Sequence, residues 1–483
     1  MAPVKRNILY SIVLSCSQYI VPLIVFPYIS RVLGPEKLGL VNFIDGTIDY
    51  YIILSMLGMG TLGIRETARY KHNPASLNIT FSSLITLNFI STVIACSILL
   101  ISFFTVDAFH AHPRLILTGG LKLIFNFLLI EWFYKGLEEF KFITIRTIIV
   151  RLIYIIAIFL FVRNSSDYLE YYYIFVGAII INATINILYS RHFVHFSIHN
   201  LKISSITKPF IILGFYTILT AMYTTFNIMY LGIVGTDVEV AYYTTSTKIY
   251  GIIIAMFTAF TGVMMPRLSA LLANGQNDEF KRYINKSLEF LIAFSIPVIT
   301  FGVVMTPEII NLISGPEYSG AIIPMRIVMP LVFIIGIEQI LVYQILIPNR
   351  QDRTVFINSI IGGILGVAMN LLIVSSLGAI GSSIVWVSCE CTILILSKKA
   401  VNSTMNIKIP FISLLKNILV YIPLAGLLFG IKHLIENSYI ALFSGMALLG
   451  IYIVAAQTLV LHNAEFMAFT NKIKINRSSS KDS

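Results

Sequence analysis

The sequence predicts an all-α membrane protein with about fourteen transmembrane helices, a number that follows from the length of its apolar segments. Of the 483 residues, 57% are hydrophobic and 12% are charged, whereas an average soluble domain has about 25% charged residues. Each apolar segment can cross about 30 Å of hydrocarbon as a helix, and barrel strands would be about half as long. The connections between segments alternate between rich and poor in Lys and Arg. Together these observations predict a polytopic helical bundle.

Polar or basic residues bound each of the predicted segments, and the connections between them are short. In chain order the segments cover residues 8–30, 39–62, 78–104, 115–134, 143–162, 169–190, 209–233, 240–264, 287–313, 324–347, 355–377, 379–397, 415–435 and 439–462.

The basic residues predict the orientation of the chain in the membrane. The net charge is +11, and twenty-five of the 34 Lys and Arg residues, Arg146 included, fall in one set of alternate connections. Such a set is expected on the cytoplasmic side, and both termini belong to it. A nucleic-acid-binding protein would gather its basic residues on one face. Their dispersal along the whole chain argues against that class.

The first segment resembles a signal peptide only superficially. Lys5 and Arg6 precede it, but it is longer than a signal-peptide core and no small-residue cleavage site precedes the next segment, so we expect it to be retained. Pro22 and Pro27 remove backbone hydrogen bonds within it. We expect this helix to be bent or broken there.

Enzymatic and cofactor chemistry have little support in the sequence. The longest polar connections, 265–286 and 398–414, contain no phosphate-binding Gly-Lys-Ser/Thr loop, so ATP is not expected as the direct energy source. All four cysteines fall within predicted spans, which excludes an exported disulfide framework. They are Cys16, Cys96, Cys389 and Cys391. We predict no cofactor and no metal, and leave coupling to H⁺ or Na⁺ open.

Three histidines are the nearest approach to a metal site. His192, His195 and His199 are expected to share one helical face after the segment 169–190 and could hold a metal. Because Arg191 and Lys202 are nearby, a face that contacts lipid head groups is the favoured interpretation.

The spans fall into two similar sets of six. Leu33-Gly34-Pro35-Glu36, which leads into the second segment, resembles Val234-Gly235-Thr236-Asp237, which leads into the eighth. An even number of spans in each unit would orient both copies alike, as in parallel transporter repeats. We therefore predict an N-lobe over 1–200, a C-lobe over 201–400, two appended helices over 401–465 and a basic cytoplasmic tail over 466–483.

Polar side chains recur at helical spacing in the first segment of each lobe. One stripe consists of Asn7, Ser11, Ser15 and Gln18, and the other of Thr217, Thr220, Thr224 and Asn227. Such stripes can line a water-filled path between the lobes, or they can hydrogen-bond helices to one another. Their presence in both lobes favours the first alternative.

Charged residues inside apolar segments are the sharpest functional candidates, because a charge at mid-membrane costs about 2.5–3.5 kcal/mol on insertion scales. The cations are Lys122, Arg151 and Lys248, and the carboxylates are Asp45, Asp49, Glu338 and Glu390. They could bind a substrate or a coupling ion. They could also form structural ion pairs, for example Lys122 or Arg151 with Asp45, Asp49 or Glu131, or extend toward the interface.

Several short motifs are spread over residues 1–400. They are Ser30-Arg31-Val32-Leu33-Gly34-Pro35-Glu36 with Gly39, Gly63-Ile64-Arg65-Glu66-Thr67-Ala68-Arg69, Glu131-Trp132-Phe133-Tyr134-Lys135-Gly136-Leu137-Glu138, Ala241-Tyr242-Tyr243, Met265-Pro266-Arg267-Leu268-Ser269 and Leu377-Gly378-Ala379-Ile380-Gly381. Together these motifs resemble the polysaccharide-export branch of the multidrug, oligosaccharidyl-lipid and polysaccharide transporter superfamily, which contains the O-antigen and capsule repeat-unit flippases.

This resemblance implies two six-helix lobes that form a V, as in MATE transporters, and alternating access to the two sides of a bacterial cytoplasmic membrane. The implied substrate is an oligosaccharide linked through pyrophosphate to undecaprenol, carried for surface polysaccharide synthesis. We expect a monomer in contact with membrane lipid, and the resemblance leaves open a transient association with polysaccharide polymerase and chain-length proteins.

The candidate residues follow from this task, since buried cations attract a pyrophosphate and polar side chains contact sugars. The expected substrate-binding residues are Lys248, Arg151, Lys122, Arg31, Gln18, Ser15, Thr224 and Asn227, and the expected ion-coupling residues are Asp45, Asp49, Glu338 and Glu390. Two alternatives remain, a multidrug or cation antiporter of the same superfamily and a membrane-embedded polysaccharide polymerase. The short exported connections disfavour the polymerase.

Overall fold

The computed structural model describes residues 3–198, 200–405 and 407–462. Four residues named in the sequence analysis lie outside the described residues: His199, and the side chains of Asn7, Ser11 and Cys16. The predicted tail, 466–483, lies outside them as well. The described residues form helices and turns without a strand, which confirms the predicted all-α fold.

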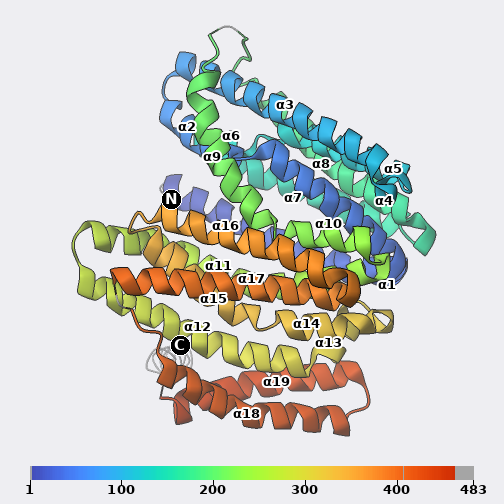
Figure 1. The fold of residues 1–483 in the computed structure, drawn as a ribbon, viewed down its shortest axis with the longest axis vertical. Coiled ribbons are helices and arrows are strands. Elements are labelled where there is room, and N and C mark those ends of the chain that lie inside the picture. Colours follow the sequence, from blue (N-terminus) through green and yellow to red (C-terminus); the bar gives the residue numbers. More distant parts are fainter. Residues whose placement is uncertain (1–2, 199, 406, 463–483) are drawn as a thin grey trace, which may run out of the picture. The chain divides into compact units, whose positions relative to one another are not determined.

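Two compact units divide the chain, Met1–Thr244 with Ser359–Cys389 and Thr245–Asn358 with Glu390–Ser483. We call them unit 1 and unit 2 (Figure 1). The chain passes between them within α11, α16 and α17. The lobe borders drawn from the sequence remain predictions.

The helices that begin in unit 1 are α1 (Pro3–Met56), α2 (Met59–Tyr70), α3 (Pro74–Thr105), α4 (Asp107–His110), α5 (Pro113–Asn126), α6 (Glu131–Leu137), α7 (Phe140–Phe161), α8 (Tyr168–Ser190), α9 (Ile203–Ala221), α10 (Thr225–Val234), α11 (Asp237–Ala273) and α17 (Ser375–Thr404). Those that begin in unit 2 are α12 (Asn277–Val304), α13 (Thr306–Ile313), α14 (Ile322–Val328), α15 (Leu331–Gln339), α16 (Asp352–Met369), α18 (Phe411–Leu434) and α19 (Ser438–Ala455). Three π-helical segments occur, η4 (Ile340–Leu346), η5 (Asn370–Val374) and η6 (Ala456–Val460). Turns of 3₁₀-helix cover Phe127–Leu129, Ser165–Asp167 and Pro316–Ala321.

Ten described helices are long and apolar enough to cross a membrane, and up to twelve if each of two bent helix pairs is one span. Two of them, Val13–Tyr70 and Asp352–Ser403, are 58 and 52 residues long, about twice the length that one crossing needs. The chain is therefore a multi-pass membrane protein. The count of fourteen spans remains a prediction.

Single glycines interrupt the two longest helices. Gly34 in α1 has φ 69° and Gly378 in α17 has φ 52°, values at which a side chain would be strained and glycine is not. The backbone of α1 breaks at Gly34 and not at Pro22 or Pro27, where helical angles persist. A proline removes one hydrogen bond but keeps φ near the helical value. Of the predicted bend or break at the prolines, a break does not occur, and a bend remains a prediction.

Unit 1 is built around α1, which packs against α3, α5, α7 and α10. The α8 helix in turn packs against α5 and α7, and the group is visible in the upper part of Figure 1. In unit 2, α12 packs against α15 and α18, and α13 packs against α19. The appended helices α18 and α19 run side by side.

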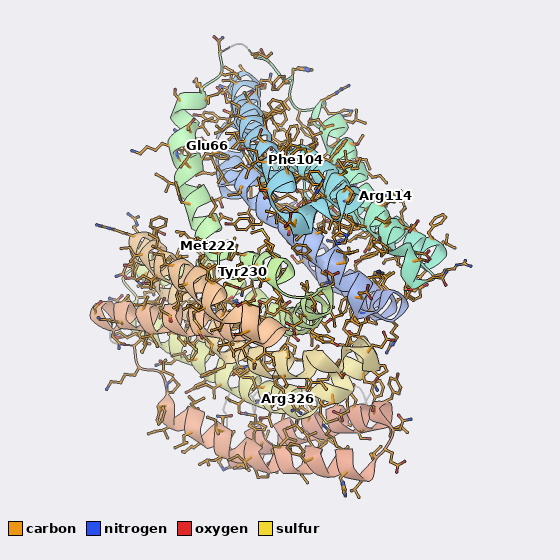
Figure 2. All side chains as sticks on the ribbon, turned by 45° about the vertical axis from the view of Figure 1, so that its right-hand side comes forward. Glu66, Phe104, Arg114, Met222, Tyr230 and Arg326 are labelled. Atoms are coloured by element: carbon orange, nitrogen blue, oxygen red, sulfur yellow. The ribbon has the colours of Figure 1, made fainter. Side chains whose placement is uncertain are left out.

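The span predicted over 209–233 is divided into α9 and α10, and Figure 2 marks the junction at Met222. Threonine hydroxyls bond to the carbonyls of their own helix here: Thr217 to Leu213 at 3.2 Å and Thr224 to Thr220 at 3.0 Å. Such bonds compete with the helical ladder and often bend a helix, which accounts for the division.

Two of the sequence motifs pack against each other in unit 1. On α2, a side-chain carbon at Gly63 would lie 2.5 Å from the ring of Trp132, and one at Gly136 of α6 would lie 2.6 Å from Thr67. Trp132, Phe133 and Tyr134 belong to the buried core beneath. These motifs therefore fix the contact between α2 and α6.

Candidate ion and substrate sites

Lys122 lies at the centre of a buried ionic cluster in unit 1. Its ammonium is 2.6 Å from a carboxylate oxygen of Asp45 and 2.6 Å from one of Asp49. The aspartates are one helical turn apart on α1, so both face α5, which carries the lysine. The Lys122 side chain is 6% exposed, against 23% for Asp45 and 47% for Asp49. The three groups together carry one net negative charge.

A second cluster surrounds Arg146, which the sequence analysis assigned to a connecting loop. Arg146 instead lies inside α7 and is buried. Its Nη1 donates to Asn186 Oδ1 at 2.5 Å, and its Nη2 donates to Glu131 Oε1 at 3.1 Å and to Thr147 at 2.9 Å. Arg146 falls inside the predicted segment 143–162. That position alone was enough to identify it as a candidate intramembrane cation.

Asn186 connects this cluster to α6 and to the turn before it. Its side-chain amide donates to the carbonyl oxygen of Leu129, and the hydroxyl of Tyr134 on α6 donates to the backbone carbonyl oxygen of Asn186 at 2.5 Å. Glu131 also lies 3.3 Å from Lys135. Because both charged and neutral partners are supplied, the guanidinium is stable in this buried position.

Arg151 is half-buried on α7 and donates from Nη1 to the hydroxyl of Ser17 on α1. Ser17 in turn donates to the carbonyl of Leu14 at 2.7 Å. Ser15 and Gln18 lie on the same stretch of α1 and are exposed. The structure thus places Arg151 beside the helix that carries two other predicted substrate-binding residues.

Arg31 is exposed near the end of the first part of α1, and its Nη1 donates to the carbonyl of Pro27 at 3.5 Å. The hydroxyl of Ser30 donates to the same carbonyl oxygen of Pro27 at 3.3 Å. Pro27 is one of the two prolines at which the sequence predicted a bend or break.

Asn227 is fully buried in a hydrogen-bond network of unit 1. Its amide donates to Tyr223 at 3.1 Å and to the Tyr243 hydroxyl at 3.3 Å, and it accepts from Asn370 at 2.5 Å. Thr224 is partly buried and bonds to its own helix. In this conformation Asn227 therefore connects different helices, which is the alternative to lining a water-filled path.

Unit 2 contains the remaining candidates. Lys248 is partly buried on α11. Glu338 is the next-to-last residue of α15, which leads into the π-helix η4, and its carboxyl group lies beside that of Glu390 on α17. Glu390 is 6% exposed. Two neighbouring carboxyl groups can share one proton in a hydrogen bond.

Polar groups surround this carboxyl pair on neighbouring elements. Tyr250 of α11 and Tyr343 of η4 both lie close enough to interact electrostatically with Glu338 and Glu390. Gln339 donates to Thr258 at 2.9 Å and accepts from Thr261 at 3.1 Å. π-Helical turns in helices are frequent at functional sites, and the π-helix η4 begins two residues after Glu338.

His192 and His195 lie beyond the end of α8 and do not share a helical face, so the prediction is wrong for these two residues, and His199 lies outside the described residues. The α8 helix ends at Ser190, and the chain beyond is held by α3: Asn78 accepts from the backbone of His195 at 2.9 Å and Ser82 from that of Ser197 at 3.0 Å. Among the described residues no group of three or more His, Cys, Asp or Glu could hold a metal.

Comparison with known proteins places the chain in a group of transporters. The family model described as polysaccharide biosynthesis protein matches residues 4–272. The protein of Escherichia coli (strain K12) named "Putative O-antigen transporter" is 24% identical over 398 residues, which cover 80% of this chain and 94% of that protein. This relative is named as a transporter and not as an enzyme, as the sequence analysis predicted.

Two solved structures share the fold. The lipid II flippase MurJ in an inward closed conformation superposes with a TM-score of 0.75 at 14% identity, over 94% of this chain and 100% of that one. An inward-facing MATE multidrug resistance transporter of the MOP superfamily superposes with a TM-score of 0.62 at 14% identity, over 80% and 96%. Since the family model covers more than half of the sequence, the chain belongs to the polysaccharide biosynthesis protein family.

Proposed function

We propose that the protein is a flippase that moves lipid-linked oligosaccharides across a membrane. The observation that carries this proposal is the match to a relative named as an O-antigen transporter, which covers 80% of this chain and 94% of that relative. The fold shared with a protein named as a lipid II flippase supports it. The chain is itself a multi-pass helical membrane protein.

The proposed substrate is a repeat unit linked through pyrophosphate to undecaprenol. A pyrophosphate cannot enter hydrocarbon without a cationic partner, and Arg151, Lys248 and Arg31 supply guanidinium and ammonium groups that suit it. Ser15 and Gln18 are exposed and can hydrogen-bond to sugars. Lys122 is left out of this set because two carboxylates already hold it.

The proposed mechanism is alternating access between the two sides of a bacterial cytoplasmic membrane, with both termini in the cytoplasm. The basic residues support this orientation through the positive-inside rule. The rearranging bodies would be the lobes 1–200 and 201–400. We further propose that the protein acts as a monomer and associates transiently with polymerase and chain-length proteins.

Proton coupling is proposed to occur at Glu338 and Glu390. A hydrogen-bonded carboxyl pair can hold or release one proton, and the change alters the charge of a buried region by one unit. Asp45 and Asp49 were equal candidates from the sequence. They are less suited because Lys122 already supplies their counter-charge.

The second candidate, a drug or cation antiporter, rests on the fold shared with the MATE transporter. Depletion of the protein in its native cell separates the candidates. A flippase predicts that single lipid-linked repeat units accumulate on the cytoplasmic face of the membrane. Accumulation on the outer face would indicate a polymerisation defect, and normal export with increased drug sensitivity would indicate an antiporter. Either result would overturn the proposal.

A further inference from the structure

A cavity open to the surface lies between α7 and α8 of unit 1, and none of the residues proposed to bind substrate lines it. Its volume is about 390 Å³. We propose that it binds an anionic phospholipid, with the phosphate at the end where α7 begins and an acyl chain along the apolar wall. This inference is independent of the transported substrate and needs only that the chain lies in a bilayer.

The wall of the cavity is apolar and open to the surrounding lipid. Ile145 and Ile149 of α7 are 44% and 51% exposed, and Val150 and Ile185 complete the surface. Neither side of this wall offers a hydrogen bond, so water would be an unfavourable occupant. An acyl chain suits this wall, because its methylene groups can pack against the exposed isoleucine side chains without leaving a polar group unsatisfied.

The end of the cavity is polar and carries the charged side chains of Glu139, Lys141 and Arg146. Lys141 is exposed, and no partner of its ammonium is found among the described residues. This is the cation that a phosphate would contact first. Phe142 and Tyr189, whose rings stack at 3.8 Å, form a rigid side wall.

Two further features make this end electropositive. The α7 helix begins at Phe140 without a side-chain cap, so its first N–H groups and the positive end of its dipole are directed to this place. The Arg146 side chain is 4% exposed and lines the cavity, and its Nε has no hydrogen-bond partner in the described structure. A buried guanidinium with an unused donor favours an anion nearby.

The charge balance distinguishes an anionic from a zwitterionic head group. Lys141 and Arg146 line this end together with Glu139. Glu131, which pairs with Arg146, also pairs with Lys135, so these five groups carry one net positive charge. The excess of positive charge favours a phosphate whose head group carries no compensating amine.

The test measures lipid binding by the purified full-length protein in detergent. Phosphatidylglycerol and phosphatidylcholine are titrated separately, and binding is followed by the rise in the unfolding temperature. Both lipids carry a phosphate, but the choline of phosphatidylcholine offsets its charge. We therefore expect phosphatidylglycerol to stabilise the protein at concentrations about tenfold lower than phosphatidylcholine. Equal effects of the two lipids would overturn the anionic assignment.

Two variants locate the site, each with a matched control. Lys141→Gln should remove the preference for phosphatidylglycerol, whereas Lys208→Gln, which changes an exposed lysine elsewhere, should keep it. Ile149→Trp should fill the cavity, whereas Ile153→Trp changes an equally exposed residue of α7 that does not line it. If the preference persists in both Lys141→Gln and Ile149→Trp, the lipid binds elsewhere and the proposal fails.

Discussion

The ammonium of Lys122 and the carboxylate of Asp45 lie 2.6 Å apart, and Asp49 accepts from the same ammonium at the same distance. The pair joins α5 to the second part of α1. Because Lys122 is almost completely buried, its charge is tolerated only with these partners.

Lys122→Met should destabilise the protein by about 2–3 kcal/mol, since it leaves two carboxylates one turn apart without a counter-charge and one of them remains half in solvent. Thermal unfolding in detergent measures the effect. Adding Asp45→Asn and Asp49→Asn to Lys122→Met should recover most of the stability. An unchanged unfolding temperature in the single variant would show that the ion pairs contribute nothing.

Gly63→Ala should destabilise the protein by about 1–3 kcal/mol, the usual cost of overpacking, because the new carbon would lie 2.5 Å from Trp132. Gly60→Ala on the same helix is the control, since no atom lies within 4 Å of its new carbon. It should be neutral or slightly stabilising. The measurement is the unfolding temperature of each variant. Equal temperatures would contradict the close contact between Gly63 and Trp132.

Lys432 and Glu308 form a partly buried ion pair of 3.2 Å between α18 and α13. Lys432→Met should therefore loosen the appended helices and cost about 3 kcal/mol, whereas Lys432→Met with Glu308→Leu should be close to neutral. Limited proteolysis of α18 and α19 is the measurement. Equal cleavage of the single and double variants would show that the pair does not anchor these helices.

Lys248→Ala should reduce export of lipid-linked repeat units at least tenfold, if its ammonium contacts the pyrophosphate as proposed. The measurement is surface polysaccharide in cells that contain the variant as the only copy, normalised to the amount of protein in the membrane. Lys286→Ala, which changes an exposed residue of α12, serves as the control. Normal export by Lys248→Ala would remove this residue from the proposed substrate site.

Glu338→Gln and Glu390→Gln should each abolish the response of transport to a proton gradient, because an amide preserves the shape of the carboxyl group but cannot exchange its proton. Transport into vesicles is measured under separate proton and sodium gradients. Glu317→Gln, at an exposed position, should behave as wild type. A proton dependence that survives in both variants would exclude the carboxyl pair as the coupling site.

The helical membrane fold could be predicted from the sequence because apolar length and charge asymmetry are local properties. Some predicted spans coincide with one helix, as 143–162 does with α7 (Phe140–Phe161), whereas others are divided, as 209–233 is between α9 and α10. Where tertiary contacts decide the backbone, the prediction failed. The residues after α8 were expected to be helical, but hydrogen bonds from their backbone to Asn78 and Ser82 of α3 hold them in another conformation.

The charged candidates were identifiable by residue type, but their partners were not. Lys122 was assigned both to substrate binding and to a pair with Asp45 or Asp49, and only the arrangement of α1 and α5 selects the pair. Arg146 was overlooked because a basic residue near the start of a span resembles a loop residue. Its partner Asn186 is forty residues away in the chain, a separation that no local pattern reveals.

The contact between Gly63 and Trp132 also affects what a sequence match can mean. These residues stand in two of the motifs by which the chain resembles its family, and the structure uses them to pack α2 on α6. A motif of this kind reflects the packing of helices. It can identify distant members of the family without indicating their substrate, so residues that determine substrate specificity should be sought at other positions.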